Sequence, residues 1–158
     1  MSQQRRILVV ANRTADSPEL IVALRQRCPV ARLTLLVPAV PHGFAWAADM
    51  KAGWPEAIAR AEAGAARMRA AGLGVEETIV GDPDPFAAAG DAIHAREFDE
   101  VIVSTLPRGV SRWLRLDLPE RLRRAVDLPV ARVTAHVTPV QARPLRRQMQ
   151  YERLLTLR

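Results

Sequence analysis

The chain has 158 residues, of which 49% are hydrophobic and 25% charged, the profile of one globular domain that folds without disulfides or metal. Its single cysteine, Cys28, excludes a disulfide framework and a cysteine-based metal site, and predicts a small packed side chain. The net charge of +6 is uneven, since residues 137–158 hold five arginines against one glutamate and the remainder is close to neutral. Nucleic-acid binding is therefore not expected.

Five short apolar segments alternate with helical patterns along the chain. The predicted strands are Ile7–Val10, Ala31–Val37, Val75–Val80, Val101–Val103 and Val130–Val133, the last with an extension toward Val137. The alternation of polar and apolar residues in Val75–Val80 indicates a strand nearer the sheet edge. The helices between them are expected to begin at Pro18, Trp54, Pro85 and just after Asp117. This alternation predicts right-handed crossovers and an α/β fold, a doubly wound five-stranded parallel sheet with helices on both faces.

The helix starts carry signals that can be checked residue by residue. Ser17 and Asp84 each precede a proline and are predicted N-caps. Asp117, with Glu120 three residues later, resembles a capping box. In the second helix, apolar residues at spacings of four and three predict a buried stripe of Trp54, Ile58, Ala61, Ala65 and Met68.

The ends of the chain show no targeting or membrane signal. Residues 1–6 lead directly into a strand without the apolar segment of a signal peptide, and no run approaches 18 apolar residues. We expect a cytoplasmic α/β domain over residues 1–137 and a basic C-terminal extension over residues 138–158. Apolar residues within the extension favour a helix that docks on a partner subunit. The alternative is a frayed basic tail.

The location of a ligand site follows from the predicted topology. In doubly wound sheets, ligands bind beyond the carboxyl ends of the strands, where the strand order reverses. The segments that follow the first four strands are residues 11–16, 38–47, 81–84 and 104–112, which are polar or irregular. The site is therefore expected among these segments.

No catalytic or metal-binding motif occurs in the sequence. The G-x-G-x-x-G, P-loop and G-x-S-x-G patterns are absent, which disfavours the dinucleotide-binding, NTPase and hydrolase classes. His42, His94 and His136 lie on separate elements without helical partners, so no metal site is predicted. His42 is the one candidate for proton transfer at the ligand end, but no catalytic set can be assembled around it, and we assign no catalytic residue.

A tripeptide at the end of the third strand indicates a family. Gly81-Asp82-Pro83, followed by an Ala-rich helix, a fourth strand and a basic loop, resembles the universal stress proteins, and the entry to the last strand through Leu128-Pro129-Val130 is also similar. The likeness covers residues 6 to about 137. It implies a sheet in the order 3-2-1-4-5, a regulatory or stress-response role, an adenine nucleotide such as ATP or AMP as ligand, and a homodimer formed through the last strand.

The chain departs from the nucleotide-binding branch of that family at two places. The branch carries G-x-x-G, nine residues and then Gly-Ser or Gly-Thr after strand four, whereas residues 104–128 contain one glycine, Gly109, and Leu106 stands where the first glycine would fall. Pro107 removes an amide donor, and Asn12 replaces the acidic residue after strand one. These changes argue against an ordinary ATP loop, but side-chain donors can still form an anion site.

The resemblance implies base and ribose contacts near Asn12 and Asp82, and phosphate contacts from Ser104 onward. The expected ligand contacts are Asn12, Gly81, Asp82, Ser104, Thr105, Arg108, Gly109, Ser111 and Arg112. The alternative for Arg108 and Arg112 is that they lie on a solvated helix face and do not contact a ligand. Three functions remain open: weak binding of an adenine nucleotide or another small anion, a ligand-free dimeric interaction module, or an enzyme of the broader adenine-nucleotide hydrolase-like group. The phosphate-binding signature typical of that last group is absent from the segments after strands one and four.

Overall fold

The computed structural model describes residues 4–40, 53–107, 109, 113 and 117–136. Several of the predictions concern residues outside these ranges. They are the proton-transfer candidate His42, the contacts Arg108, Ser111 and Arg112, the extension of the last strand to Val137, and the C-terminal extension over residues 138–158.

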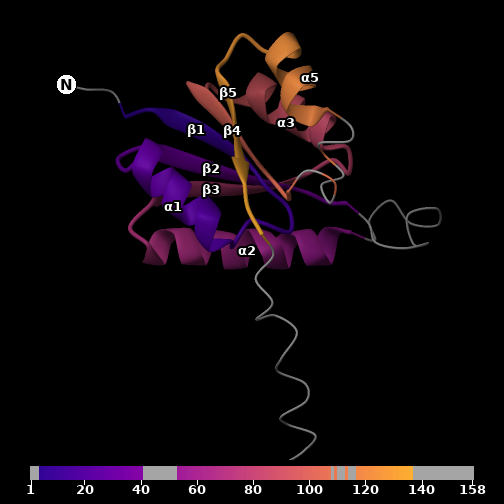
Figure 1. The fold of residues 1–158 in the computed structure, drawn as a ribbon. Helices are drawn as coiled ribbons and strands as arrows, with labels where there is room; N and C mark the ends of the chain where they lie inside the picture. Colours follow the sequence, from indigo (N-terminus) through magenta and orange to yellow (C-terminus); the bar gives the residue numbers. More distant parts are fainter. Residues whose placement is uncertain (1–3, 41–52, 108, 110–112, 114–116, 137–158) are drawn as a thin grey trace, which may run out of the picture.

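Five parallel strands form the sheet, in the order β3-β2-β1-β4-β5 (Figure 1). They are β1 (Arg6–Val10), β2 (Arg32–Pro38), β3 (Gly74–Gly81), β4 (Glu100–Thr105) and β5 (Val130–Thr134). The central strand β1 pairs with β2 on one side and with β4 on the other, and Ile7 lies opposite Leu33 and Glu100. The predicted parallel sheet and its order are confirmed.

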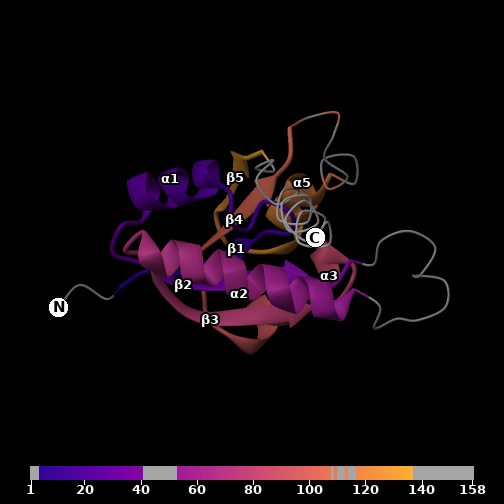
Figure 2. The same ribbon diagram turned by 90° about the horizontal axis from the view of Figure 1, so that it is seen from below.

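Two layers of helices enclose this sheet. The described helices are α1 (Pro18–Arg27), α2 (Trp54–Ala70), α3 (Pro85–Ala95) and α5 (Leu118–Ala125). The helices α1 and α2 pack on one face, whereas α3 and α5 pack on the other, and Figure 2 shows α2 running beneath the sheet. None of the helices in the described ranges is long and apolar enough to cross a membrane.

Alternate residues of the central strands enter two separate cores. Ile7 and Val9 of β1 face α1 and α2, whereas Leu8 and Val10 face α3 and α5. Because both faces are covered, the central strands are apolar at successive positions, which is the pattern that predicted them. The edge strand β3 is only partly buried, as its polar alternation indicated.

Two of the three predicted helix caps are confirmed. Ser17 Oγ accepts a hydrogen bond of 3.2 Å from the Leu20 amide, and Asp84 Oδ1 accepts one of 3.0 Å from the Phe86 amide. The capping box at Asp117 is wrong, because this residue is left-handed, with φ 54°, and its side chain makes no capping hydrogen bond. An N-cap side chain reaches the first turn from an extended backbone, which this conformation does not provide.

The buried face of α2 differs from the predicted stripe. Its buried residues are Ala57, Ala61, Gly64, Ala65 and Met68. Trp54 and Ile58 are 37% and 45% exposed, so the prediction that they lie in the core is wrong. The helix is seated through its small residues, since a Cβ added at Gly64 would lie 2.9 Å from the Ala15 carbonyl oxygen.

Candidate functional site

The strand order reverses between β1 and β4. From β1 the chain crosses to β2 on one side of the sheet, whereas β4 lies on the other side of β1 and continues to β5. In such folds the crevice that binds ligands is expected at this reversal of strand order, beyond the carboxyl ends of the two strands. Asn12 follows β1, and Ser104 and Thr105 are the last two residues of β4.

A buried hydrogen bond joins the two sides of this crevice. Thr14 Oγ1 and Ser104 Oγ lie 2.7 Å apart, and both residues are almost completely buried. The loop after β1 is also held by two backbone turns, in which the amides of Ala15 and Ser17 donate to the carbonyls of Asn12 and Thr14. The base of the crevice is therefore braced by contacts within the protein.

Asn12 is contacted by an arginine from α2. Arg60 Nη1 donates a hydrogen bond of 2.7 Å to Asn12 Oδ1, and Arg60 Nη2 lies 3.5 Å from Glu56 Oε2 one helical turn earlier. The Arg60 side chain is 28% exposed, so it places a cation beside Asn12. Arg60 could not be predicted from the sequence, because it is an ordinary polar residue of an amphipathic helix and belongs to no motif.

Thr105 ends β4 with a buried hydroxyl. Its backbone oxygen accepts from the Ala135 amide at 2.8 Å, but its Oγ1 has no hydrogen-bond partner among the described residues. Such an unsatisfied buried group costs about 1–3 kcal/mol. Since strand residues alternate, Ser104 faces the α1 and α2 layer and Thr105 the opposite layer, so the two hydroxyls serve different sides of the sheet.

Gly81 and Asp82 have clear structural roles at the end of β3. A Cβ added at Gly81 would lie 2.8 Å from the Ala88 Cβ, so glycine is needed for α3 to pack there. Asp82 is exposed, and its Oδ1 accepts from the Asp84 amide at 2.8 Å, which supports the turn that starts α3. Within the described residues, no hydrogen bond connects either residue to Asn12 or Ser104.

The loop after β4 is described at a few positions only. Gly109 has φ +93°, a left-handed conformation that favours glycine, and it is exposed. Trp113 is 8% exposed and packs in the core beneath α3 and α5, which anchors the loop to that layer.

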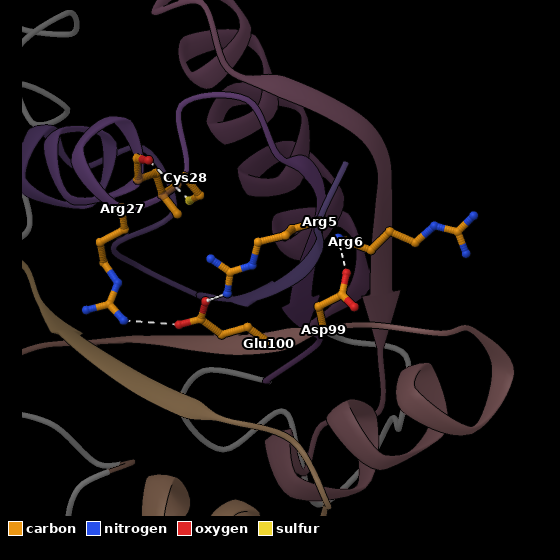
Figure 3. A network of polar contacts seen from close by, with 7 residues as sticks. Arg5, Arg6, Arg27, Cys28, Asp99 and Glu100 are labelled. Atoms are coloured by element: carbon orange, nitrogen blue, oxygen red, sulfur yellow. Dashed lines mark hydrogen bonds and ion pairs between the residues drawn. The ribbon is translucent and has the colours of Figure 1, made fainter. Parts of the chain in front are cut away.

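The amino end of the sheet carries a different set of polar residues (Figure 3). Buried Glu100 accepts hydrogen bonds from Arg5 at 2.5 Å and from Arg27 at 3.0 Å, and the Arg6 amide donates to Asp99 at 2.7 Å. A cavity of about 210 Å³ lies beside them, lined by both signs of charge. These charged groups are partners of one another.

Cys28 lies near this network and is buried, as predicted. Burial raises the pKa of its thiol, and the negative charge of Glu100 raises it further. The thiol donates to the Leu24 carbonyl at 3.1 Å. A thiol held in its protonated form is a poor nucleophile, so Cys28 has a packing role.

The described histidines are engaged in local contacts. His94 Nδ1 lies 2.7 Å from the Gly90 carbonyl oxygen on its own helix, and His136 Nδ1 lies 2.9 Å from Glu19 Oε1 at the start of α1. In the ranges that the structure describes, no three potential ligands from histidine, cysteine, aspartate and glutamate gather as a metal site would require.

The parallel sheet, with its strand order reversed between β1 and β4, places the chain in the class of doubly wound α/β proteins. Comparison with known proteins shows which fold of that class it has. No family model and no curated protein matches the sequence. A universal stress protein solved in complex with cAMP is similar in structure, with a TM-score of 0.53 and 19% identity over 87% of this chain and all of that one.

Two further solved structures extend this likeness. A universal stress protein from Archaeoglobus fulgidus in complex with dAMP has a TM-score of 0.54 and 14% identity, over 84% of this chain and 99% of that one. A universal stress family protein from Arabidopsis thaliana with AMP bound has a TM-score of 0.58 and 11% identity, over 90% of this chain and 97% of that one. The chain therefore has the universal stress protein fold, as Gly81-Asp82-Pro83 predicted.

Proposed function

We propose that this chain is a cytoplasmic regulatory domain that binds a nucleotide, or a related small anion, in the crevice between β1 and β4. The observation that carries the proposal is the group of hydrogen-bond donors there. Arg60 places a cation beside Asn12, which is half-buried just after β1. Three similar structures hold cAMP, dAMP or AMP, which supports a nucleotide as the ligand.

The proposed role is binding without catalysis. The contacts around Asn12 and Ser104 involve an amide, a guanidinium and two hydroxyls, and Arg60 is paired with Glu56. No nucleophile stands beside a base among these described groups, so they provide recognition and positive charge but no proton transfer.

We propose that the phosphate is held by the loop after β4. Backbone and side-chain donors from Arg108, Gly109, Ser111 and Arg112 would replace the glycine-rich loop that the family resemblance implies. Gly109 is exposed and left-handed, a conformation that brings a backbone close to a ligand without a Cβ in the way. In this proposal residues 1–137 form the binding domain, and residues 138–158 are a separate basic extension.

Thermal unfolding of the full chain with AMP, cAMP, ATP and inorganic phosphate tests the proposal. A nucleotide at 100 times its Kd should raise the free energy of unfolding by about 2.7 kcal/mol, and therefore the Tm by roughly 5–11 °C. Arg60→Ala should reduce this shift, whereas Arg67→Ala, at an exposed position of the same helix, should leave it unchanged. The proposal is wrong if no nucleotide raises the Tm.

A ligand-free dimeric module is the second candidate function. β5 is an edge strand in the described sheet, with Val130, Ala131 and Val133 only partly buried, so a second copy would extend the sheet there. Arg123 Nε already donates to the Val130 carbonyl oxygen at 3.1 Å, which occupies one end of this edge. This candidate predicts a dimer by analytical ultracentrifugation together with no Tm shift from any nucleotide.

A further inference from the structure

A small cavity lies at the amino end of the sheet, at the opposite end from the crevice between β1 and β4. Its volume is about 120 Å³, and it is formed where the starts of β1, β2 and β3 meet residues 96–98, which follow α3. Among the described residues, three arginines, three glutamates, one threonine and one phenylalanine line it. We refer to it as the Thr34 cavity.

A β-bulge brings two of the glutamates to this cavity. Leu33 lies opposite Val75, whereas Thr34 lies opposite Glu77, so Glu76 is an extra residue in β3. In a regular strand, consecutive side chains face opposite sides of the sheet. Both Glu76 and Glu77 nevertheless line the cavity, because the bulge interrupts this alternation. Bulges of this kind re-aim side chains beside functional sites in other proteins.

Two of the ion pairs around the cavity are closed. Arg96 donates two hydrogen bonds to the Glu77 carboxylate. Arg32 Nη1 lies 3.3 Å from Glu76 Oε1, and its Nε donates to Gln4 Oε1 at 3.0 Å. These groups give the cavity walls of both charges that are held in place by one another.

The third pair, between Arg6 and Glu97, is open. Arg6 Nη1 and Glu97 Oε2 are 3.9 Å apart, which is beyond hydrogen-bond distance, and the two side chains are 48% and 96% exposed. The Arg6 guanidinium makes no hydrogen bond to another described residue, and Figure 3 shows it pointing away from Arg5 and Glu100. A guanidinium and a carboxylate are therefore accessible side by side at the cavity.

Thr34 and Phe98 supply the uncharged part of the lining. Thr34 is 7% exposed and faces the α3 layer, because its neighbours Leu33 and Leu35 face α1 and α2. No hydrogen bond joins its hydroxyl to another described residue. The volume is that of about four water molecules at ~30 Å³ each, and is below the roughly 300 Å³ at which pockets for drug-sized ligands begin. The cavity therefore fits a small molecule and excludes a nucleotide.

We propose that the Thr34 cavity binds a small zwitterion, an α-amino acid about the size of alanine. The ligand carboxylate accepts from the Arg6 guanidinium, and the ligand ammonium donates to the Glu97 carboxylate. A ligand with one charge only would lie against side chains of both signs and leave one of them opposed. This site is separate from the nucleotide crevice, so the proposal does not depend on the proposed function.

Calorimetric titration of the full chain at pH 7 with L-alanine, propionate and L-alanine methyl ester tests the proposal. Propionate keeps the carboxylate without the ammonium, and the ester keeps the ammonium without the carboxylate. L-alanine should bind at least about tenfold more tightly than either, because it alone pairs with both Arg6 and Glu97. The proposal is overturned if L-alanine does not bind, or if one of the single-charge compounds binds as tightly.

Arg6→Gln and Glu97→Gln test the position of the site. Each removes one charge of the open pair and should weaken L-alanine binding by about tenfold. Arg25→Gln on α1 and Glu62→Gln on α2 make the same charge changes at exposed positions and should keep the parent affinity. Unchanged affinity in either Arg6→Gln or Glu97→Gln would contradict the proposal. Saturating AMP should not displace L-alanine, and competition between them would instead place the amino acid in the nucleotide crevice.

Discussion

The polar groups at the two ends of the sheet differ in whether they have partners within the protein. At the amino end, Glu100 is buried between Arg5 and Arg27, so each charge is matched within the protein (Figure 3). At the carboxyl end, the Thr105 hydroxyl has no partner among the described residues, and Asn12 has a donor without an acceptor there. Satisfied polar groups stabilise a fold, whereas unsatisfied buried ones lower its stability. The polar groups around Glu100 are thus matched at the amino end, and those at the carboxyl end, where we propose that the nucleotide binds, are incompletely matched.

The largest expected change in the free energy of unfolding comes from a substitution at the amino end of the sheet. Glu100→Leu removes the carboxylate that pairs with Arg5 and Arg27, and should lower the free energy of unfolding by about 2 kcal/mol. The loss is less than for a fully buried pair, because the two arginine side chains are 53% and 49% exposed and can be hydrated. Urea denaturation measures the change. Nucleotide affinity should be unaffected, and a large loss of binding would contradict the proposed separation of the two ends.

A slightly smaller loss of stability is expected when a glycine at the carboxyl end of the sheet is replaced. Gly81→Ala would push a methyl group into Ala88, and should destabilise the protein by between about 1 and 2 kcal/mol. Gly90→Ala is the matched control, since its Cβ would meet no atom within 4 Å and helix propensity should favour it by roughly 0.5–1 kcal/mol. Unchanged stability in Gly81→Ala would show that α3 does not require this glycine.

Thr105→Val tests the unpartnered hydroxyl directly. The substitution keeps the shape and removes a buried polar group, so it should raise the free energy of unfolding by about 1 kcal/mol and weaken the nucleotide if the hydroxyl contacts it. Ser104→Ala, next in the strand, removes the hydrogen bond to Thr14 and should lower stability by about 1 kcal/mol instead. Chemical denaturation should show a rise in the free energy of unfolding for Thr105→Val and a fall for Ser104→Ala. A loss of stability in Thr105→Val would mean that the hydroxyl has a partner.

The smallest expected effect concerns acid stability. The backbone amide of Glu19, and then the contact with His136, lower the pKa of the Glu19 carboxyl below its ordinary value of 4.5. Glu19 therefore stabilises the fold above pH 4.5, and this contribution is lost as the pH falls through the lowered pKa. Glu19→Gln should flatten the fall of Tm in this acid range, whereas Glu62→Gln on α2 should not. The effect is small because both partners are substantially exposed.

Local sequence patterns were sufficient for most of the fold. Continuous apolar runs predicted the buried strands, because a parallel sheet is covered on both faces, and the alternation in residues 75–80 predicted an edge strand. Ser17 and Asp84 were identified as caps because a cap depends on its own side chain and the next few amides. Asp117 failed the same test, since its backbone is left-handed and its side chain makes no capping hydrogen bond.

The expected location of the site was also derived from sequence, since it requires only the order of the elements. The structure places Asn12, Ser104 and Thr105 at the ends of β1 and β4, and a ligand site there stays a prediction. The partners of these residues did not follow, because Arg60 is 48 residues from Asn12, and Thr14 is 90 residues from Ser104. No periodicity or motif relates residues so far apart in the chain.

The sequence by itself determined the strands, most helix starts and the end of the sheet where a ligand is expected, because these depend on residue type, spacing and connection order. The tertiary structure alone decided which polar groups are satisfied. Glu100 meets Arg5 across 95 residues, and Asn12 meets Arg60 because α2 is seated at Gly64. Hydrogen bonds over such separations depend on the relative positions of packed elements, and those positions are set by side-chain fit in the assembled core.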